Sequence, residues 1–309
     1  MKIGFRLFAR QTSTGWVWGE EHMVEGLAKR IGRLTGEAVW VGDRNESAKG
    51  VDVMVSFASE FDGVPPTPGA RNILWQQFPG ALREDRILPL SQLGRTYDFV
   101  YCGSRRLQES VNWPGKSEVL YVTADDELPP RTQTASENGI VFVGNHHRHL
   151  RSEARLRTFL EPAACLGLAI YGSGWETAPE QLRKRWRGPL NFGRVYDVYR
   201  GAAIVMSIHG DNHVALEMPN SRIMEAAACS ACVVSDRFPE LEKLFGDAVA
   251  WTEGNEALRI TLTELLGDPP RRERFGVAAR RRLLEQCGLE MTARRIIGRS
   301  ASLMKEPSK

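Results

Sequence analysis

The densest group of side chains that could do chemistry lies between residues 217 and 236. Pro219, Asn220 and Ser221 have the composition of a helix start, in which Asn220 or Ser221 is the expected N-cap. The free backbone N–H groups of such a helix start suit a phosphate group. Glu225 lies about one turn further on, where a carboxylate can accept both hydroxyls of a ribose. The alternative interpretation is a capped helix whose Glu225 is solvated, and this segment alone favours neither.

Another polar loop follows an apolar, strand-like run that ends at Ile208. It contains His209, Asp211, Asn212 and His213. Loops at the carboxyl ends of strands are where site residues collect, so this loop is a second candidate region. A solvated loop without a role in function is an equally good interpretation.

Two clusters of metal-binding residue types are interpreted as structural. His146, His147 and His149 follow a predicted strand, but adjacent histidines do not easily share one ion and no carboxylate or thiol cluster adjoins them. Cys229 and Cys232 form a lone Cys-x2-Cys without a second ligand pair, so we expect buried thiols. The sequence therefore predicts no metal site.

The pattern of apolar residues predicts the scaffold that positions these segments. Short continuous apolar runs, which suit parallel strands covered on both faces, alternate with stretches of helical period. The expected strands are Lys2–Phe8, Ala38–Val41, Val51–Phe57, Asn72–Trp75, Phe99–Cys102, Val119–Val122, Ile140–Val143, Leu168–Tyr171, Ala203–Ile208, Ala231–Ser235 and Ala248–Trp251. The expected helices are Glu20–Leu34, Arg151–Leu166, Ser221–Ala228, Ala257–Leu266 and Arg271–Gln286. This alternation predicts an α/β fold with doubly wound parallel sheets.

The best domain boundary is the polar, proline-broken segment from Asp125 to Asn138. It divides the chain into an N-terminal α/β domain, residues 1–137, and a C-terminal α/β domain, residues 138–309, each large enough for its own core. Ligands of such sheets bind outside the carboxyl ends of the strands. The default site is therefore the cleft between the two domains.

Composition limits the class of protein. The 309 residues include 41 Lys and Arg against 38 Asp and Glu, a balance that does not indicate a protein built around nucleic acid. We expect no membrane span, no secretory signal and no disulfide framework, and hence a reducing cytoplasm. Residues 271–309 hold eleven Lys and Arg against four Glu. A solvated helix is the plainer interpretation of this stretch, and peripheral contact with the inner face of a membrane is the alternative.

The order of several segments resembles the donor-binding half of GT-B glycosyltransferases, notably family 4 (glycosyl transferases group 1) and its CgeB-like relatives. Glu217 and Glu225 stand eight residues apart, as in the Glu-x7-Glu motif of that family. Three upstream segments follow in the family's order: Val141–Asn145, Ile170–Trp175 and Asn191–Val195. The resemblance covers about residues 138–304 and implies two Rossmann-like, doubly wound domains facing each other across a cleft.

The resemblance implies a role for each matching residue. Glu225 would hold the ribose hydroxyls, and Glu217 would lie by the donor sugar and the reacting carbon. The backbone of Gly193, Arg194 and Val195 would meet the nucleobase. The candidates for the diphosphate are Asn145, Arg148, Arg151, Asn220, Ser221 and Arg222. Glu217 and Arg148 are the catalytic candidates, because a guanidinium can meet the charge that develops on a leaving diphosphate.

In the first half, Thr14–Glu20 stands where such enzymes have a glycine-rich loop between the first strand and the first helix, although the usual adjacent glycine pair is missing. Gly15, Trp16, Trp18 and Glu20 are the acceptor-side candidates. Tryptophans next to glycines are hard to bury together, and aromatic rings suit the apolar faces of sugars.

The resulting hypothesis is a cytoplasmic, hexosyltransferase-like glycosyltransferase. It would move a sugar from a nucleoside-diphosphate donor, a UDP-sugar favoured over a GDP-sugar, to a hydroxyl of a saccharide or another acceptor. The resemblance implies a retaining reaction that needs no metal ion and no further cofactor. Two alternatives stay open. One is a non-catalytic sugar-nucleotide or glycan binder at a surface. The other is a nucleic-acid glycosyltransferase, which the basic residues after Arg271 alone support, so nucleic acid is disfavoured as a partner.

Overall fold

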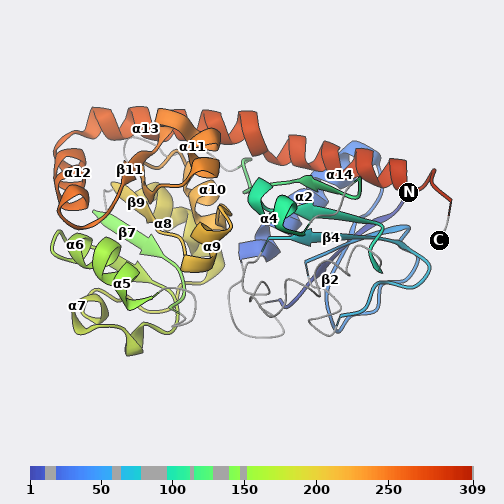
Figure 1. Ribbon diagram of the computed structural model, residues 1–309, viewed down its shortest axis with the longest axis horizontal. Helices are drawn as coiled ribbons and strands as arrows, with labels where there is room; N and C mark the ends of the chain where they lie inside the picture. The colour runs from blue at the N-terminus through green and yellow to red at the C-terminus, as the bar shows by residue number, and fades with distance from the viewer. Residues whose placement is uncertain are drawn as a thin grey trace. The chain divides into compact units, whose positions relative to one another are not determined.

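The computed structural model describes residues 1–10, 19–57, 64–77, 96–111, 115–127, 139–146 and 152–307 (Figure 1). The chain forms two compact units. Unit 1 consists of Met1–Asp125 together with Cys287–Lys309, and unit 2 consists of Asp126–Gln286. Each unit contains a parallel sheet with helices between its strands, which confirms the predicted α/β fold of two Rossmann-like domains.

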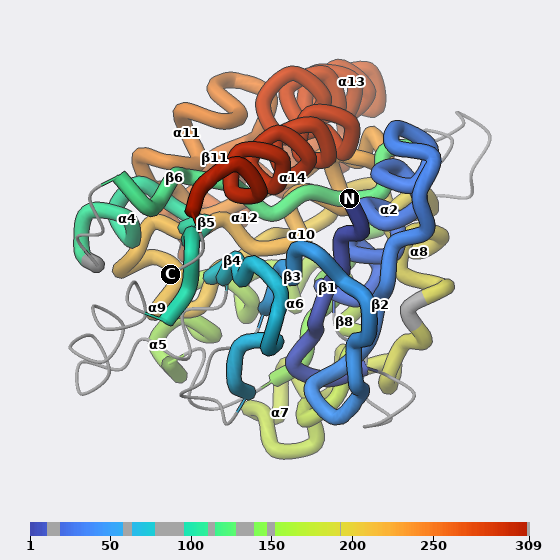
Figure 2. The backbone as a smooth tube through the Cα atoms, turned by 90° about the vertical axis from the view of Figure 1, so that its right-hand side faces the viewer, coloured from blue at the N-terminus to red at the C-terminus, as the bar shows by residue number. Residues whose placement is uncertain are grey.

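Unit 1 is built on a six-stranded parallel sheet of order β2-β1-β3-β4-β5-β6 (Figure 2). The strands are β1 (Ile3–Leu7), β2 (Trp40–Asp43), β3 (Val53–Ser56), β4 (Arg71–Gln76), β5 (Phe99–Cys102) and β6 (Ser117–Val119). Helix α2 (Gly19–Thr35) follows β1, and helix α4 (Arg105–Val111) follows β5. The central strands β1, β3 and β4 are almost entirely buried because both of their faces are covered, as the fully buried Val53, Met54 and Val55 of β3 illustrate.

Helix α14 (Leu289–Leu303) also belongs to unit 1, where it packs against α2. The two helices approach closely at Gly26, where an added Cβ would lie 3.4 Å from a methyl group of Leu289. Across the same contact, Arg30 Nη1 lies 2.5 Å from Glu290 Oε2. The first unit is thus completed by a segment that follows the whole of the second unit in sequence.

Unit 2 is built on a five-stranded parallel sheet of order β11-β10-β9-β7-β8. The strands are β7 (Ile140–Val143), β8 (Ala169–Tyr171), β9 (Ile204–Ser207), β10 (Val233–Asp236) and β11 (Ala250–Thr252). The helical elements are α5 (Glu153–Arg155), a π-helical turn (Leu156–Leu160), α6 (Glu161–Ala164), α7 (Glu180–Arg183), α8 (Val195–Gly201), α9 (Asp211–Ala215), α10 (Ser221–Ala228), α11 (Pro239–Phe245), α12 (Asn255–Gly267) and α13 (Pro269–Cys287).

Helices cover both faces of the second sheet. Helix α12 packs on α6 and against β9 and β11, and the core on this side includes Ile204, Met206 and Leu262. Helices α8 and α10 pack on each other and on strands β7, β9 and β10. Because both faces are closed, a ligand of this sheet has its place at the carboxyl ends of the strands.

Among the boundaries that differ from those expected, one lies within a helix and one is the division between the domains. The expected helix 151–166 is broken by the π-helical turn Leu156–Leu160, because Pro162 lacks the N–H that would bond to the Thr158 carbonyl. The expected division at residues 137 and 138 assigned everything up to residue 309 to one domain, whereas α14 lies with unit 1. An amphipathic pattern indicates that a helix buries one side, and it does not indicate which sheet that side covers.

The arginines of α13 are largely engaged in packing. Arg272 donates to the Leu265 carbonyl at 2.6 Å and Arg282 to the Leu244 carbonyl at 2.9 Å. The exposed charged side chains of this helix are of both signs: Glu273, Arg274, Arg281 and Glu285. Among the described residues, no helix is both long enough and apolar enough to cross a membrane.

Candidate functional site

The start of α10 lies at the carboxyl ends of β9 and β10, and Asn220 is its N-cap. The Asn220 Oδ1 accepts a hydrogen bond from the Ile223 backbone N–H at 3.2 Å and lies 3.3 Å from the Ser207 Oγ. The first N–H groups of an α-helix have no carbonyl acceptor within the helix. Since Asn220 takes the N–H of Ile223, those of Ser221 and Arg222 are the donors that this helix start offers to an anion.

Glu225 lies one turn into α10 and is 6% exposed, so the solvated interpretation of this side chain is wrong. The hydroxyl of Tyr199, from α8, donates to Glu225 Oε2 at 3.3 Å. Burial and the nearby charge of Glu225 raise the pKa of Tyr199 well above its ordinary value, so the phenol stays a hydrogen-bond donor. Glu225 is thus a carboxylate held in one orientation.

Arg222 was expected to face a diphosphate, and its guanidinium lies instead against the ends of two strands. It donates to the carbonyls of Val143 and Ile208 and lies 4.5 Å from the centre of the Phe142 ring. Burial lowers the pKa of this group. The Arg222 side chain therefore ties β7 to β9, which leaves its backbone N–H as the group that this residue could offer to an anion at the helix start.

Glu217 lies in the connection between α9 and α10 and has a positive φ of 52°. A residue other than glycine in this left-handed conformation is uncommon, and such strain clusters at functional sites. Neighbouring bonds hold the connection in place, since the His213 Nδ1 and the Met218 N–H bond to carbonyls at 3.0 Å and 2.8 Å. The half-buried Glu217 is therefore presented by an ordered turn.

Asn145 lies in the loop after β7 and is engaged with the next loop. Its Oδ1 accepts a hydrogen bond from the Ser173 N–H at 2.9 Å. Gly172 and Gly174 allow this contact, since a Cβ at either would overlap the backbone of Gly144 or His146. The His146 ring stacks on Trp175 with centroids 5.0 Å apart. The side chain of Asn145 thus shapes the loop, and the loop backbone is what a ligand could meet.

The segment predicted to meet a nucleobase is a 3-10 turn (Phe192–Arg194) that leads into α8. The Gly193 N–H bonds to Asn191 Oδ1 at 3.1 Å, and Val195 is buried. The Arg194 side chain is 71% exposed and pairs with Asp197. Because α8 also carries Tyr199, this turn and Glu225 belong to the same packed pair of helices.

Seven residues singled out in the sequence analysis lie outside the described residues: Gly15, Trp16, Trp18, His147, Arg148, His149 and Arg151. Of the acceptor-side set, only Glu20 is described. It lies in the first turn of α2, and burial raises the pKa of its carboxyl group. Next to it, Glu21 is buried and accepts a hydrogen bond from the Arg10 Nε at 2.9 Å.

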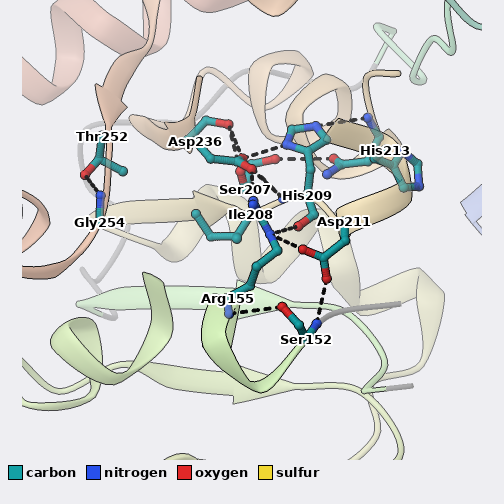
Figure 3. A network of polar contacts seen from close by, with 12 residues as sticks. Ser152, Arg155, Ser207, Ile208, His209, Asp211, His213, Asp236, Thr252 and Gly254 are labelled. Carbon is teal, nitrogen blue, oxygen red and sulfur yellow. Dashed lines mark hydrogen bonds and ion pairs between the residues drawn. The ribbon is translucent and has the colours of Figure 1, made fainter. Parts of the chain in front are cut away.

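The sequence indicates His209 and Asp211 as candidates but not their partners Asp236 and Arg155, with which they form a polar network after β9 and β10 (Figure 3). The His209 side chain is fully buried, with its Nδ1 2.7 Å from Asp236 Oδ1. Arg155 donates to Asp236 and, at 3.0 Å, to the His209 carbonyl. The available signal was positional, because His209 and Asp236 each end an apolar run and adjacent parallel strands bring such positions together.

Cys229 and Cys232 are buried, as expected for structural thiols. Burial raises the pKa of Cys229 to about 12, so its thiol is protonated near neutral pH. Within the part of the chain that is described, no group of three His, Cys, Asp or Glu side chains is arranged to hold a metal ion.

Residues 148–298, slightly under half of the chain, match the family model described as glycosyl transferase-like. The search of curated proteins gave no match. Three solved structures superpose over nearly the whole chain. Sucrose-phosphate synthase from Thermosynechococcus elongatus has a TM-score of 0.72 at 14% identity, covering 98% of this chain and 99% of its own. AviGT4, a glycosyltransferase involved in avilamycin A biosynthesis, has a TM-score of 0.68 at 17% identity, covering 98% of both chains.

The third structure is Anabaena HepE in complex with UDP and glucose, which has a TM-score of 0.66 at 10% identity, covering 98% of this chain and 100% of its own. The chain has the GT-B glycosyltransferase fold. The structural likeness bears out the expected GT-B architecture. The family match over residues 148–298 bears out the expected class of enzyme, a glycosyltransferase. In this GT-B protein the matched residues include Asn220, Glu225, His209 and Asp236.

Proposed function

We propose that this protein moves a sugar from a nucleoside-diphosphate donor to an acceptor hydroxyl, with a UDP-sugar preferred to a GDP-sugar as the donor. The proposed reaction retains the anomeric configuration and needs no metal ion. The observation that carries the proposal is the start of α10, where two N–H groups that lack an acceptor within the helix precede a buried, oriented Glu225 by about one turn. A diphosphate is bound by hydrogen-bond donors, and the hydroxyls of a ribose are bound by a carboxylate that accepts their hydrogen bonds. The first two turns of this helix provide both kinds of group. That HepE was solved with UDP and glucose supports a uridine donor.

In this proposal the N–H groups of Ser221 and Arg222 meet the diphosphate, and Glu225 accepts the ribose hydroxyls. The backbone of Gly193, Arg194 and Val195 lines the nucleobase, and the backbone at Asn145 faces the phosphates. Arg148 and Arg151 meet the charge of the leaving diphosphate, and Glu217 lies by the donor sugar. These assignments follow the segment order of the family and the hydrogen bonds described above.

The proposed chemistry balances without a protein nucleophile. The bond between the anomeric carbon and the diphosphate oxygen breaks, and the acceptor oxygen bonds to the same face of that carbon. The acceptor proton passes to the leaving diphosphate, which departs with it. Neutralising the developing charge with Arg148, Arg151 and the helix start is then the main contribution to the rate.

On the acceptor side we propose the start of α2, with Gly15, Trp16, Trp18 and Glu20. Glu20 supports this assignment because burial raises the pKa of its carboxyl group, and perturbed carboxyl groups cluster at functional sites. The acceptor is proposed as a saccharide or another hydroxyl compound, and the setting as the cytoplasm. All five cysteines are free thiols, which supports a reducing compartment.

The test is thermal unfolding with UDP, GDP, dTDP, CMP and ADP, on the wild type, on Glu225→Ala and on the control Glu264→Ala. Glu264 is an exposed glutamate of α12, away from the start of α10. A ligand at 100 times its dissociation constant adds about 2.7 kcal/mol of stability. We expect UDP to stabilise the wild type and the control and to have little effect on Glu225→Ala.

Stabilisation by none of these nucleotides at millimolar concentration would contradict the proposal. If UDP stabilises the wild type and the control as expected, but neither hydrolysis of UDP-glucose nor transfer to any acceptor is detected, the protein is a non-catalytic sugar-nucleotide binder and the proposal of an enzyme is wrong. Transfer to DNA or RNA in preference to saccharides would favour the nucleic-acid glycosyltransferase.

A further inference from the structure

The start of α10 is held by a buried histidine and aspartate that are 27 residues apart in sequence. His209 follows β9 and Asp236 ends β10, and these neighbouring strands run parallel. The Asn220 N–H donates to the His209 Nε2 at 3.2 Å. The Nδ1 of the same ring lies 2.7 Å from Asp236 Oδ1 (Figure 3). A backbone N–H can only donate, so Nε2 is the bare nitrogen and Nδ1 carries the proton that bonds to Asp236.

The groups around this pair keep the ring neutral. Arg155 balances the charge of Asp236, and Arg222 also lies close enough to act on His209. Burial lowers the pKa of His209 more than the Asp236 carboxylate raises it. A protonated ring would place two N–H donors against each other at Asn220. The neutral tautomer therefore fits every hydrogen bond that His209 makes.

Two independent bonds fix the N-cap residue itself. His209 holds the backbone N–H of Asn220, and the side chain of the same residue lies 3.3 Å from the Ser207 Oγ. Both partners are fully buried. Helix ends ordinarily fray, because their first N–H groups lack partners within the helix. Here the residue before the first helical turn is anchored on its backbone and on its side chain.

The same network reaches a second segment of the proposed donor site. Asp211 Oδ2 accepts a hydrogen bond from the Ser152 N–H at 2.7 Å, and Asp211 Oδ1 lies 3.8 Å from the Arg155 Nε. Ser152 directly follows Arg151 in the chain. Ser152 and Asn220 are thus both connected to Arg155, Ser152 through the exposed Asp211 and Asn220 through the buried His209 and Asp236.

We infer that His209 and Asp236 are positioning residues for the donor diphosphate, which set the direction of the Ser221 and Arg222 N–H groups by holding the peptide of Asn220. This inference rests on the proposed function, since it deepens the account of the same site. It separates the site into two parts. Glu225 determines affinity for the nucleoside, whereas the His209–Asp236 pair determines affinity for the phosphates.

The experiment compares His209→Gln with His209→Asn. The Gln oxygen can reach the place of Nε2 and accept the Asn220 N–H, whereas the shorter Asn reaches only the place of Nδ1. Binding of UDP and of uridine is measured for each variant. We expect His209→Asn to weaken UDP binding about tenfold with uridine affinity unchanged, because one positioned hydrogen bond is lost. His209→Gln should recover most of the UDP affinity.

The control is Arg272→Leu, which removes another buried polar anchor of unit 2, the bond to the Leu265 carbonyl. It should lower thermal stability and leave UDP affinity unchanged. Equal UDP affinity in His209→Asn and His209→Gln would overturn the inference, as would a parallel loss of UDP and uridine binding in His209→Asn.

A measurement without ligand keeps the inference separate from the proposed function. Hydrogen exchange of the Asn220, Ser221 and Arg222 amides should be faster in His209→Asn than in His209→Gln. If exchange follows this order but the wild type binds no nucleotide, His209 does hold the Asn220 peptide and the proposed function is wrong. If exchange is the same in both variants, the anchor itself is refuted, whatever the wild type binds.

Discussion

Glu225 and Tyr199 are a buried pair in which each side chain affects the other, since Glu225 favours the protonated phenol and Tyr199 orients the carboxylate. Burial, together with the charge of Glu225, raises the pKa of Tyr199 and keeps the phenol protonated, and its hydroxyl donates to one carboxylate oxygen at 3.3 Å. Such a pair fixes the plane of the carboxyl group before a ribose arrives. Because the Glu225 carboxylate is ordered in advance, less entropy is lost when a ribose binds.

Replacing Tyr199 with Phe should reduce UDP affinity severalfold and lower the free energy of unfolding by about 1–3 kcal/mol, because a buried carboxylate oxygen loses its donor. Calorimetric titration and chemical unfolding measure the two effects. Tyr171→Phe, on β8, is the matched control and should leave UDP affinity unchanged. An unaltered affinity in Tyr199→Phe would show that this hydroxyl does not orient Glu225.

The buried His209 predicts how stability depends on pH. Burial holds its pKa in the folded protein below the ordinary value of 6.5, with Asp236, Arg155 and Arg222 as the charged groups around it. Its contribution is therefore complete above pH 6.5 and declines as the pH falls, since the unfolded chain takes up the proton first. The free energy of unfolding of the wild type should fall more steeply between pH 7 and pH 5 than that of His209→Gln. Identical slopes would mean that His209 does not titrate differently in the two states.

Single residues were predictable where a local signal exists. Asn220 could be predicted as an N-cap because its own sequence neighbours define the helix start, and the structure confirms it. The direction of Arg222 could not be predicted, since the carbonyls it bonds to, Val143 and Ile208, come from other strands. The pairing of His209 with Asp236 is likewise a tertiary contact, which their places after two apolar runs indicate only once β9 and β10 are known to be neighbours.

At the level of elements, buried strands gave the clearest signal. The bounds of Ile140–Val143 and Phe99–Cys102 agree with the prediction because both are short apolar runs covered on two faces. The edge strand β6 begins at Ser117 and Glu118, whose polar side chains do not resemble a strand, and its predicted range was displaced toward Val122. The packing of α14 on α2 was not predicted, because the pattern of an amphipathic helix does not indicate which element its apolar side covers.

Helix α13 lies against the turn after α10 at Gly276. A Cβ at this position would overlap the carbonyl group of Ser230, a residue whose own φ is 56°. Gly276→Ala should therefore destabilise the protein by about 1–3 kcal/mol, although alanine favours helices. Gly267→Ala is the control, because nothing lies within 4 Å of a Cβ there. Chemical unfolding compares the two, and equal stability would contradict this close contact.

At the level of the whole molecule, the two units differ in whether they are formed by a continuous stretch of the chain. Unit 2 is one continuous stretch, whereas unit 1 needs α14 to cover α2. Leu289, Ile296 and Leu303 of α14 are each no more than 1% exposed. Burying side chains of this size contributes roughly 1.5–3 kcal/mol each.

A chain that ends at residue 286 should retain UDP binding by unit 2 and lose several kcal/mol of stability in unit 1. Thermal unfolding should then resolve two transitions, of which UDP raises only one. A chain ending at residue 304, which keeps α14, is the control and should behave like the wild type. Loss of UDP binding in the shorter chain would show that unit 2 does not fold without α14.

The place of α14 in unit 1 also bears on the order in which the protein can form during synthesis. The ribosome completes the sheet strands of the first unit early, but the helix that covers α2 emerges only after all of unit 2 has been made. The part of α2 that α14 covers therefore lacks its partner throughout that interval. By the end of the interval unit 2 has every segment it needs. Contacts between segments so far apart in sequence also form slowly, so the last step of folding should be the closure of the first unit.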